Sequence, residues 1–174
     1  MAYRNKTFVS FASEDIHFYR LMQAWRSNQN VEFDFHDAHD LNTARDTSEP
    51  ETIRRRLRER LMNTKQVVLL VGDTTRAVAN DQTRFLYYEV ETIKKLDLPV
   101  VFANLNGSRR AQTSRLPATL SKQYTVSVPF RLPAIRYALD EFCATYPSRR
   151  LTQSGPRRYL PALYFALNAD GTLS

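Results

Sequence analysis

The chain has 174 residues, of which 43% are hydrophobic, with four glycines and a single cysteine, Cys143. This length suits one compact domain with its own core, and one cysteine excludes an internal disulfide framework. The formal net charge of +7 favours anionic partners without choosing among nucleotide, nucleic acid and acidic protein. No run of 18 apolar residues and no apolar signal segment near the start are present, so we expect a soluble, cytoplasmic protein without a membrane partner.

The first part of the chain predicts two strands separated by a helix. Residues 6–11 and residues 31–35 form short apolar runs that are typical of strands. Between them, apolar side chains recur at i, i+3, i+4 and i+7, which predicts one core-facing helical stripe. The stripe consists of Phe18, Leu21, Met22 and Trp25. The following residues, 36–50, are polar and lack periodicity, so we expect a long loop.

The middle of the chain predicts a basic helix and two buried strands. Residues 51–62 carry an apolar stripe of Ile53, Leu57 and Leu61. Five arginines lie mostly outside it: Arg54, Arg55, Arg56, Arg58 and Arg60. Residues 66–71 and 99–105 are continuous apolar runs, as expected for parallel strands that are covered on both faces. A helix over residues 83–97 connects them.

The remaining elements complete a repeated pattern. Residues 124–130 predict a fifth strand, and a last helix begins near Pro133. Five βα units indicate an α/β fold of flavodoxin-like or TIR-like type, in which helices flank a five-stranded parallel sheet on both faces. We expect this domain to span residues 1–147. Residues 148–174 would be a C-terminal extension that packs on the domain or on a partner, since its apolar side chains are unsuited to water.

Glu89 is unusual because it places a carboxylate within the apolar arc of the helix at residues 83–97. The other members of that arc are Phe85, Leu86, Val90, Ile93 and Leu96. Glu91 lies on the opposite side, where it can pair with Lys95. A carboxylate that loses its hydration needs a partner, an altered pKa or a cleft, and such clefts are often active sites. We therefore interpret Glu89 as a candidate catalytic residue, with a structural acid paired to an arginine as the alternative.

Ligands of open parallel sheets bind outside the carboxyl ends of the strands. Residues 11–15, 36–48, 73–84 and 106–116 follow predicted strands and meet at that edge. No Gly-x-Gly-x-x-Gly or Walker motif is present, so neither type of phosphate cradle is supported. The loop contains His36, Asp37, His39 and Asp40. With three histidines in the chain and no cysteine nearby, this group favours a solvated polar loop over a metal site.

A phosphoacceptor receiver domain shares this βα order. Glu14, Asp15 and Asp73 even lie at suitable strand ends. Receivers, however, need a lysine before the proline that follows the fifth strand, and Val128 occupies this position. The pattern therefore disfavours a receiver.

The order of segments resembles a TIR domain, and in particular the TIR-like, NAD-consuming subunits of bacterial Thoeris anti-phage systems. The matching segments are FVSFASED at the first strand end, the long loop after FDF, QVVLLVGD, and RFLYYEV in the third helix. The likeness covers roughly residues 5–146. Its most specific part is the motif aromatic-x-x-x-Glu-aliphatic, which begins at Phe85 and contains Glu89.

The resemblance implies an NAD+ glycohydrolase or cyclase that makes an ADP-ribose-derived signal, with NAD+ as substrate and no cofactor. By resemblance, Glu89 contacts the ribose next to nicotinamide and supports cleavage of the N-glycosidic bond. A carboxylate near the anomeric carbon stabilises oxocarbenium-like charge. Phe85 stands where the family often has tryptophan and would place its ring face beside nicotinamide.

The resemblance also implies the rest of the substrate site. Phe11, Ala12 and Ser13 would line the nucleotide cleft. His36 would join them from the loop at residues 36–48, which corresponds to a family loop that gates the site or contacts a neighbouring subunit. The implied partners are a second copy of the chain on activation, a phage-derived trigger, and a downstream effector that responds to the product.

Two alternatives remain beside this interpretation. The arginine run at residues 54–60 favours a solvated helix face over a nucleic-acid footprint, because no aromatic residues interleave it and no recognition motif is present. The alternative function is a non-catalytic TIR assembly or adaptor module, since a fold does not determine a function.

Overall fold

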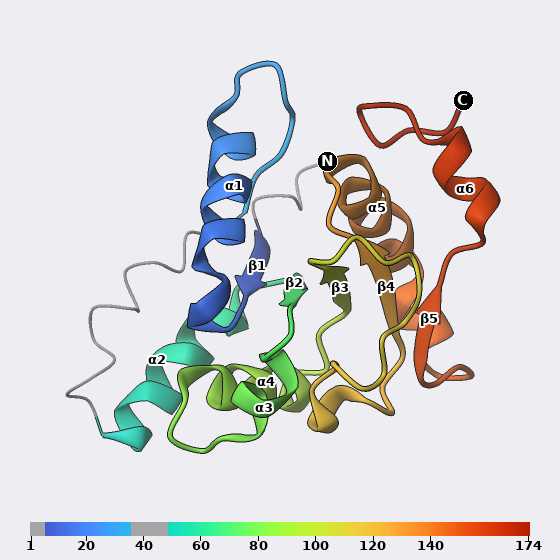
Figure 1. Cartoon of the computed structure of the whole chain (residues 1–174). Helices are drawn as coiled ribbons and strands as arrows, with labels where there is room; N and C mark the ends of the chain where they lie inside the picture. The colour runs from blue at the N-terminus through green and yellow to red at the C-terminus, as the bar shows by residue number, and fades with distance from the viewer. Residues whose placement is uncertain (1–5, 36–48) are drawn as a thin grey trace.

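The computed structural model describes residues 6–35 and 49–174 and contains one five-stranded parallel sheet (Figure 1). The strands lie side by side in chain order: β1 (Thr7–Ser10), β2 (Gln66–Val71), β3 (Val100–Asn104), β4 (Thr125–Pro129) and β5 (Pro156–Arg158). The predicted α/β class with a five-stranded parallel sheet is confirmed, although one of the five strands is not the one that the sequence suggests.

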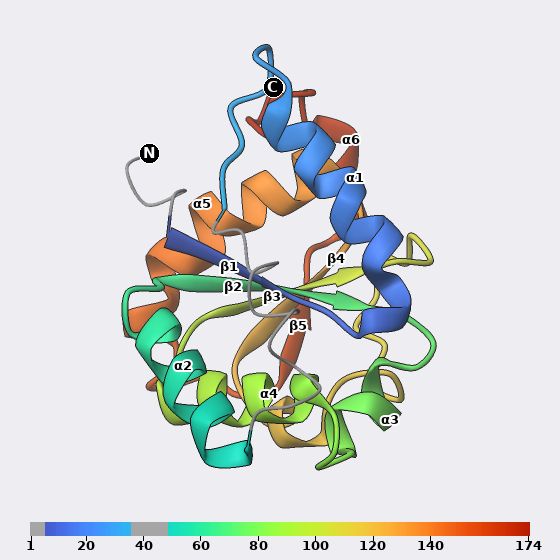
Figure 2. The same ribbon diagram turned by 90° about the vertical axis from the view of Figure 1, so that its left-hand side faces the viewer.

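Helices cover both faces of the sheet (Figure 2). One face carries α1 (Ile16–Ser27) and α5 (Leu132–Arg149), and the other carries α2 (Pro50–Met62), α3 (Thr75–Asn80) and α4 (Phe85–Lys95). The short elements are η2 (Ser13–Asp15), η4 (Ala118–Leu120) and α6 (Pro161–Ala166). Within the described ranges, no helix is both long and apolar enough to cross a membrane.

Alternation along the strands divides the core between these two faces. In β2, Val68 and Leu70 pack on the side of α1 and α5, whereas Val67 and Leu69 pack on the side of α2 and α4. All six residues of β2 are buried, because both faces of the sheet are covered.

The strand predicted at residues 31–35 is absent, and this expectation was wrong. The Phe33 N–H donates to the Val31 carbonyl at 3.0 Å, and the Phe35 N–H donates to Asp34 Oδ1 at 2.8 Å. These local hydrogen bonds replace a strand ladder. Phe33 and Phe35 are still buried, and the Phe35 ring lies 5.7 Å from the Tyr19 ring. The alternating apolar pattern of residues 31–35 therefore results from burial beneath α1 and not from pairing with β1.

The predicted stripe of α1 is shifted by a fraction of a turn. Tyr19 and Met22 are fully buried, whereas Leu21 is 45% exposed. Phe18 and Trp25 flank the buried line, and their rings lie 5.3 Å and 5.0 Å from the ring of Phe130. Leu21 is about 200° around the helix from Tyr19, so burial of the tyrosine directs the leucine to solvent.

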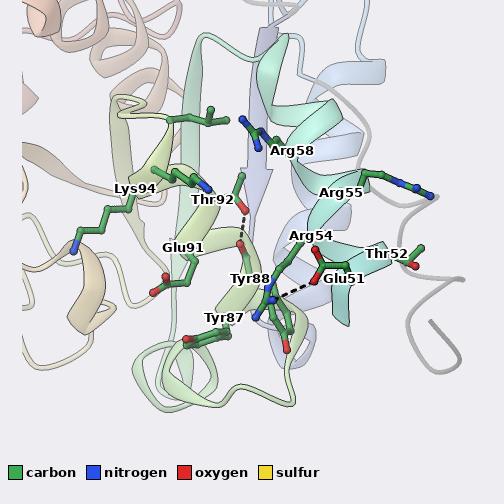
Figure 3. Close-up of a pocket in the computed structure, with 12 residues that line it drawn as sticks. Glu51, Thr52, Arg54, Arg55, Arg58, Tyr87, Tyr88, Glu91, Thr92 and Lys94 are labelled. Carbon is green, nitrogen blue, oxygen red and sulfur yellow. Dashed lines mark hydrogen bonds and ion pairs between the residues drawn. The ribbon is translucent and has the colours of Figure 1, made fainter. Parts of the chain in front are cut away.

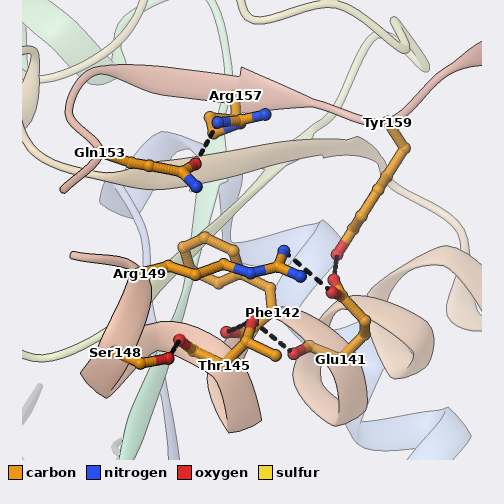
Figure 4. A network of polar contacts seen from close by, with 8 residues as sticks. All are labelled: Glu141, Phe142, Thr145, Ser148, Arg149, Gln153, Arg157 and Tyr159. Carbon is orange, nitrogen blue, oxygen red and sulfur yellow. Dashed lines mark hydrogen bonds and ion pairs between the residues drawn. The ribbon is translucent and has the colours of Figure 1, made fainter. Parts of the chain in front are cut away.

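The sheet takes β5 from the segment that the sequence suggests as an extension. α5 continues through Pro147 to Arg149, and β5 then pairs in parallel with β4. Figure 4 shows how side chains attach the strand to the helix. The Tyr159 hydroxyl donates to Glu141 Oε2 at 2.9 Å, and Arg149 donates to Glu141 Oε1 at 3.3 Å. Burial and the nearby Glu141 carboxylate raise the pKa of Tyr159, which keeps its hydroxyl available as the donor.

The C-terminal turn lies close to the backbone of α5. Gly171 has φ of 81°, and a Cβ at this position would lie 2.9 Å from Arg136 Cβ and 3.0 Å from the Pro133 carbonyl oxygen. Gly107 also has a positive φ, 77°, but a Cβ there would meet nothing within 4 Å. A substitution at Gly107 therefore introduces backbone strain alone, whereas a substitution at Gly171 introduces both backbone strain and a steric clash.

We predict that Gly171→Ala destabilises the protein more than Gly107→Ala does. Gly107→Ala should lower the free energy of unfolding by about 1–2 kcal/mol, the cost of the left-handed conformation for a residue with a Cβ. Gly171→Ala adds a steric clash, for a total of about 2–4 kcal/mol. Urea denaturation followed by circular dichroism measures both. Equal losses would contradict the close packing of the C-terminal turn against α5.

Candidate functional site

Helix α4 directs a carboxylate into the protein, as the sequence predicts. Leu86, Glu89, Val90 and Ile93 are all buried, and Glu89 is only 3% exposed. The Ser10 Oγ donates a hydrogen bond to Glu89 Oε2. A buried carboxylate without a hydrogen-bond donor costs free energy, and the hydrogen bond from Ser10 lowers the cost of burying Glu89.

Ser10 is the last residue of β1, and its side chain is fully buried. The hydrogen bond to Glu89 therefore joins the carboxyl end of the first strand to the second turn of α4, across 79 residues of sequence. Parallel sheets bind ligands at this edge. The sequence does not predict a role for Ser10, because a serine within a short apolar strand gives no sign of the distant carboxylate that it contacts.

A small cavity of about 190 Å³ lies at the same edge. Phe11, Ser13 and Phe85, three of the predicted substrate residues, line it together. Side chains from α2, α3, the segment before α4 and the first turn of α4 complete the wall: Ile53, Val78, Thr83, Arg84, Leu86 and Tyr88. The structure therefore brings residues from both ends of the resemblance, FVSFASED and RFLYYEV, to one place.

The other predicted site residues are placed differently. Ala12 is fully buried and is not part of the cavity wall, and neither is Glu89. His36 and the rest of the loop at residues 36–48 lie outside the described residues. The assignment of roles to Glu89, Phe11, Ala12, Ser13, His36 and Phe85 stays a prediction.

Arg84 binds two residues at the border of the cavity, and the sequence does not reveal this contact. Its Nη2 donates to Ser13 Oγ at 2.9 Å and to the two carboxylate oxygens of Glu14 at 2.8 Å and 2.9 Å. This hydrogen bonding from Arg84 holds the pKa of Glu14 below its ordinary value. Arg84 directly precedes the helical motif, and Glu14 follows β1. The sequence could therefore suggest this contact only by placing both residues at the same edge of the sheet.

The other acids at this edge have separate surroundings. Asp73 forms an ion pair with Arg115 at 2.8 Å. Asp15 packs against Gly72, where an added Cβ would lie 2.6 Å from Asp15 Oδ2, and burial raises the pKa of Asp15. The three acids therefore have different immediate partners, although the Glu14 and Asp73 carboxylates both add to the rise in the pKa of Asp15 that burial causes.

Chemically, the site combines a dry carboxylate, an aromatic-lined cavity and a cation at the border. Its volume is below the roughly 300–1,000 Å³ of most small-molecule sites, so it holds part of a ligand unless the wall moves. The Arg84 contacts with Ser13 and Glu14 are partly exposed and weak enough to open.

We predict that Ser10→Ala is more destabilising than Ser127→Ala. Both serines are fully buried in strands, but the Ser127 hydroxyl has no hydrogen-bond partner in the described parts of the chain. Loss of the Ser10 donor removes a hydrogen bond from a buried carboxylate and should cost about 1–3 kcal/mol, whereas Ser127→Ala should be close to neutral. Urea denaturation gives both free energies of unfolding. Equal values would show that the Ser10 contact contributes little.

Glu14→Gln should reduce stability at neutral pH but not in acid. A carboxyl group with a lowered pKa in the folded state stabilises the protein above its ordinary pKa, and this contribution is lost as the pH falls through the lowered value. Both partners are partly exposed, so the difference from wild type should stay below about 1 kcal/mol. Thermal melting across this pH range measures it, with Glu59→Gln as an exposed control. A difference that persists in strong acid would contradict the ion pair as its cause.

The family model described as Thoeris protein ThsB, TIR-like domain, matches residues 8–110. The matched range contains Ser10, Phe85 and Glu89 and covers more than half of the chain. No curated protein gives a significant match. The chain therefore belongs to the Thoeris ThsB family and carries its TIR-like domain, a module of anti-phage defence.

Proposed function

We propose that this protein is a TIR-like NAD+ glycohydrolase or cyclase that produces an ADP-ribose-derived signalling nucleotide in anti-phage defence. The observation that carries the proposal is the buried Glu89, held by Ser10 at the carboxyl edge of the sheet. The cavity beside its helix takes its wall from Phe11, Ser13 and Phe85. Membership of the Thoeris ThsB family supports the same biological role.

In the proposed reaction, the bond between the ribose anomeric carbon and the nicotinamide nitrogen breaks, and both bonding electrons leave with nicotinamide. Positive charge then develops on the ribose, and the Glu89 carboxylate stabilises it. Attack by water gives ADP-ribose and a proton. Attack by a nucleophilic nitrogen of the same molecule gives a cyclised isomer instead. The buried surroundings strengthen the attraction between carboxylate and developing charge.

Substrate entry requires the border of the cavity to open. The diphosphate of NAD+ would compete with Glu14 for Arg84, which then becomes a cationic contact for the substrate. The basic surface of the chain favours the same anionic substrate. We propose that the closed cavity belongs to a resting form, and that assembly with further copies after a phage-derived signal opens it. The product would then act on a downstream effector.

One observation favours the alternative, a non-catalytic assembly or adaptor module. Glu89 is 97% buried and does not line the cavity, so it has no direct path to a ligand in this conformation. In that alternative, the Ser10 contact with Glu89 is a structural hydrogen bond only. The two functions differ in whether a change at Glu89 alters chemistry or only stability.

We predict that Glu89→Gln lowers nicotinamide release at least about 100-fold while the protein stays folded. The amide keeps an oxygen that accepts the Ser10 hydrogen bond but loses the negative charge. Concentrated wild type, Glu89→Gln and the surface control Glu59→Gln are incubated with NAD+, with and without lysate of phage-infected cells. Chromatography and mass analysis then quantify nicotinamide, ADP-ribose and cyclised products.

Equal nicotinamide release by wild type and Glu89→Gln would contradict a catalytic role for the carboxylate. If no folded protein released nicotinamide under any of these conditions, the assembly module would replace the enzyme as the best interpretation.

A further inference from the structure

A second and larger hollow lies between α2 and α4 and shares the side chain of Tyr88 with the cavity beside Glu89 (Figure 3). It is an open groove of about 1270 Å³. Five cationic side chains border it: Arg54, Arg55, Arg58, Lys94 and Lys95. Figure 3 shows Arg58 extending from α2 toward α4, whereas Arg55 and Lys94 extend outward from their helices. The positive charge therefore follows both walls of the groove.

The two carboxylates in the groove are already engaged. Glu51 lies 3.7 Å from Arg54, and Glu91 accepts a hydrogen bond from Thr119 at 3.3 Å. The pairing of Glu91 with Lys95 that the sequence suggests is not formed. Within the described ranges, the other four cations, Arg55, Arg58, Lys94 and Lys95, have no ion pair with a carboxylate. No carboxylate of residues 6–35 or 49–174 therefore competes with an anionic ligand for these four side chains.

Two tyrosines lie among these cations. The rings of Tyr87 and Tyr88 are 5.3 Å apart and perpendicular, at 89°. The Arg54 guanidinium lies over the Tyr88 ring at 5.2 Å, so one face of this ring is already covered. Tyr87 is half-buried and lines the groove, which leaves part of its ring open to a planar group. The Tyr88 ring lies between the two helices, and the Tyr87 ring lies on the side of α4 that also carries Glu91 and Lys94 (Figure 3).

We infer that the groove between α2 and α4 binds single-stranded nucleic acid, with phosphates on the cationic walls and a base stacked on Tyr87. Single-strand sites combine a positively charged groove with aromatic side chains on which bases stack. An acidic peptide would use the cations but would have no need for the tyrosine. α4 has 11 residues and is about 16 Å long, enough to contact a few consecutive nucleotides.

This inference reverses the sequence-based expectation of a merely solvated arginine face. The sequence shows no aromatic residue among the arginines at residues 54–60. Helix packing supplies the aromatics from α4, where Tyr88 forms a small apolar cluster with Leu57 and packs near Ile53. The tyrosines are about 30 residues away in the chain, which is why no local motif reveals them. Oligonucleotide binding and NAD+ cleavage are measured independently, so each proposal can fail without the other.

The test compares two charge reversals that change the net charge equally. Arg58 borders the groove, whereas Arg56 is an exposed arginine of the same helix outside it. Fluorescence anisotropy with a labelled 20-nucleotide deoxythymidine strand measures affinity at several salt concentrations. Arg58→Glu should weaken binding at least about tenfold more than Arg56→Glu. Arg58→Ala should also reduce the slope of log affinity against log salt by about 0.7, which is one phosphate contact.

A second variant tests the aromatic contact. Tyr87→Leu keeps an apolar side chain of similar burial but removes the stacking surface, and should weaken binding roughly tenfold. Melting temperatures of all variants confirm that they are folded. Equal effects of Arg58→Glu and Arg56→Glu, or an absent effect of Tyr87→Leu, would overturn the inference and show diffuse attraction to the charged surface.

Two competitors separate other ligands from the proposed one. A 20-residue polyglutamate peptide that binds as tightly as the oligonucleotide, and equally well to Tyr87→Leu, would make the groove an acidic-protein site and overturn the inference. Displacement of the oligonucleotide by millimolar NAD+ would instead place the dinucleotide in this groove and also overturn it. Retention of the oligonucleotide against both competitors supports the inference.

Discussion

The hydrogen bond between Ser10 and Glu89 fixes how α4 lies on the sheet. A buried carboxylate is tolerated only where a donor meets it, and the donor here is the last residue of β1. Once Glu89 faces Ser10, the rotation of the helix about its axis is set. Phe85, one turn earlier, then lies on the same side and reaches the cavity. Tyr88, about 100° away, faces α2 instead, where it packs with Leu57. This polar contact, together with the burial of Leu86, Val90 and Ile93, therefore sets what two surfaces of α4 present.

The ion pair at the sheet edge differs from the buried Ser10–Glu89 pair in its exposure to solvent. Arg84 and Glu14 are both partly exposed, so their ion pair adds little to stability and exchanges readily with water or another anion. Ser10 and Glu89 are buried and have no such freedom. A site that must stay ordered while it admits an anionic ligand needs both kinds of contact. The rigid pair keeps the carboxylate in place, and Arg84 of the labile pair lines the cavity beside the helix that carries it.

Sequence reasoning was most accurate where burial alone decides structure. The apolar runs of β2 and β3 and the burial of Glu89 were all predicted, because strands covered on both faces and a helix with one apolar arc leave strong periodic signals. It failed at residues 31–35, since alternating burial beneath a helix gives the same pattern as a strand. β5 was missed because Pro156–Arg158 is short, basic and half-exposed. Side-chain partners such as Ser10 and Arg84 depend on contacts across about 70 or more residues, which no local pattern encodes.

Among the residues that the structure describes, Tyr88 is the one whose side chain borders both hollows, the cavity beside Glu89 and the groove between α2 and α4. Its ring contacts Tyr87 on one side and lies beneath Arg54 on another. A ligand in the groove that draws Arg54 away uncovers this ring, and movement of the ring changes the wall of the cavity. Such a ligand can influence the cavity only to the extent that it binds two positions of Tyr88 with different affinities. Any coupling between the hollows is therefore limited to the free-energy difference that Arg54 and Tyr88 contribute between two such positions. The Glu89 carboxylate, which Ser10 holds by a hydrogen bond, lines neither hollow.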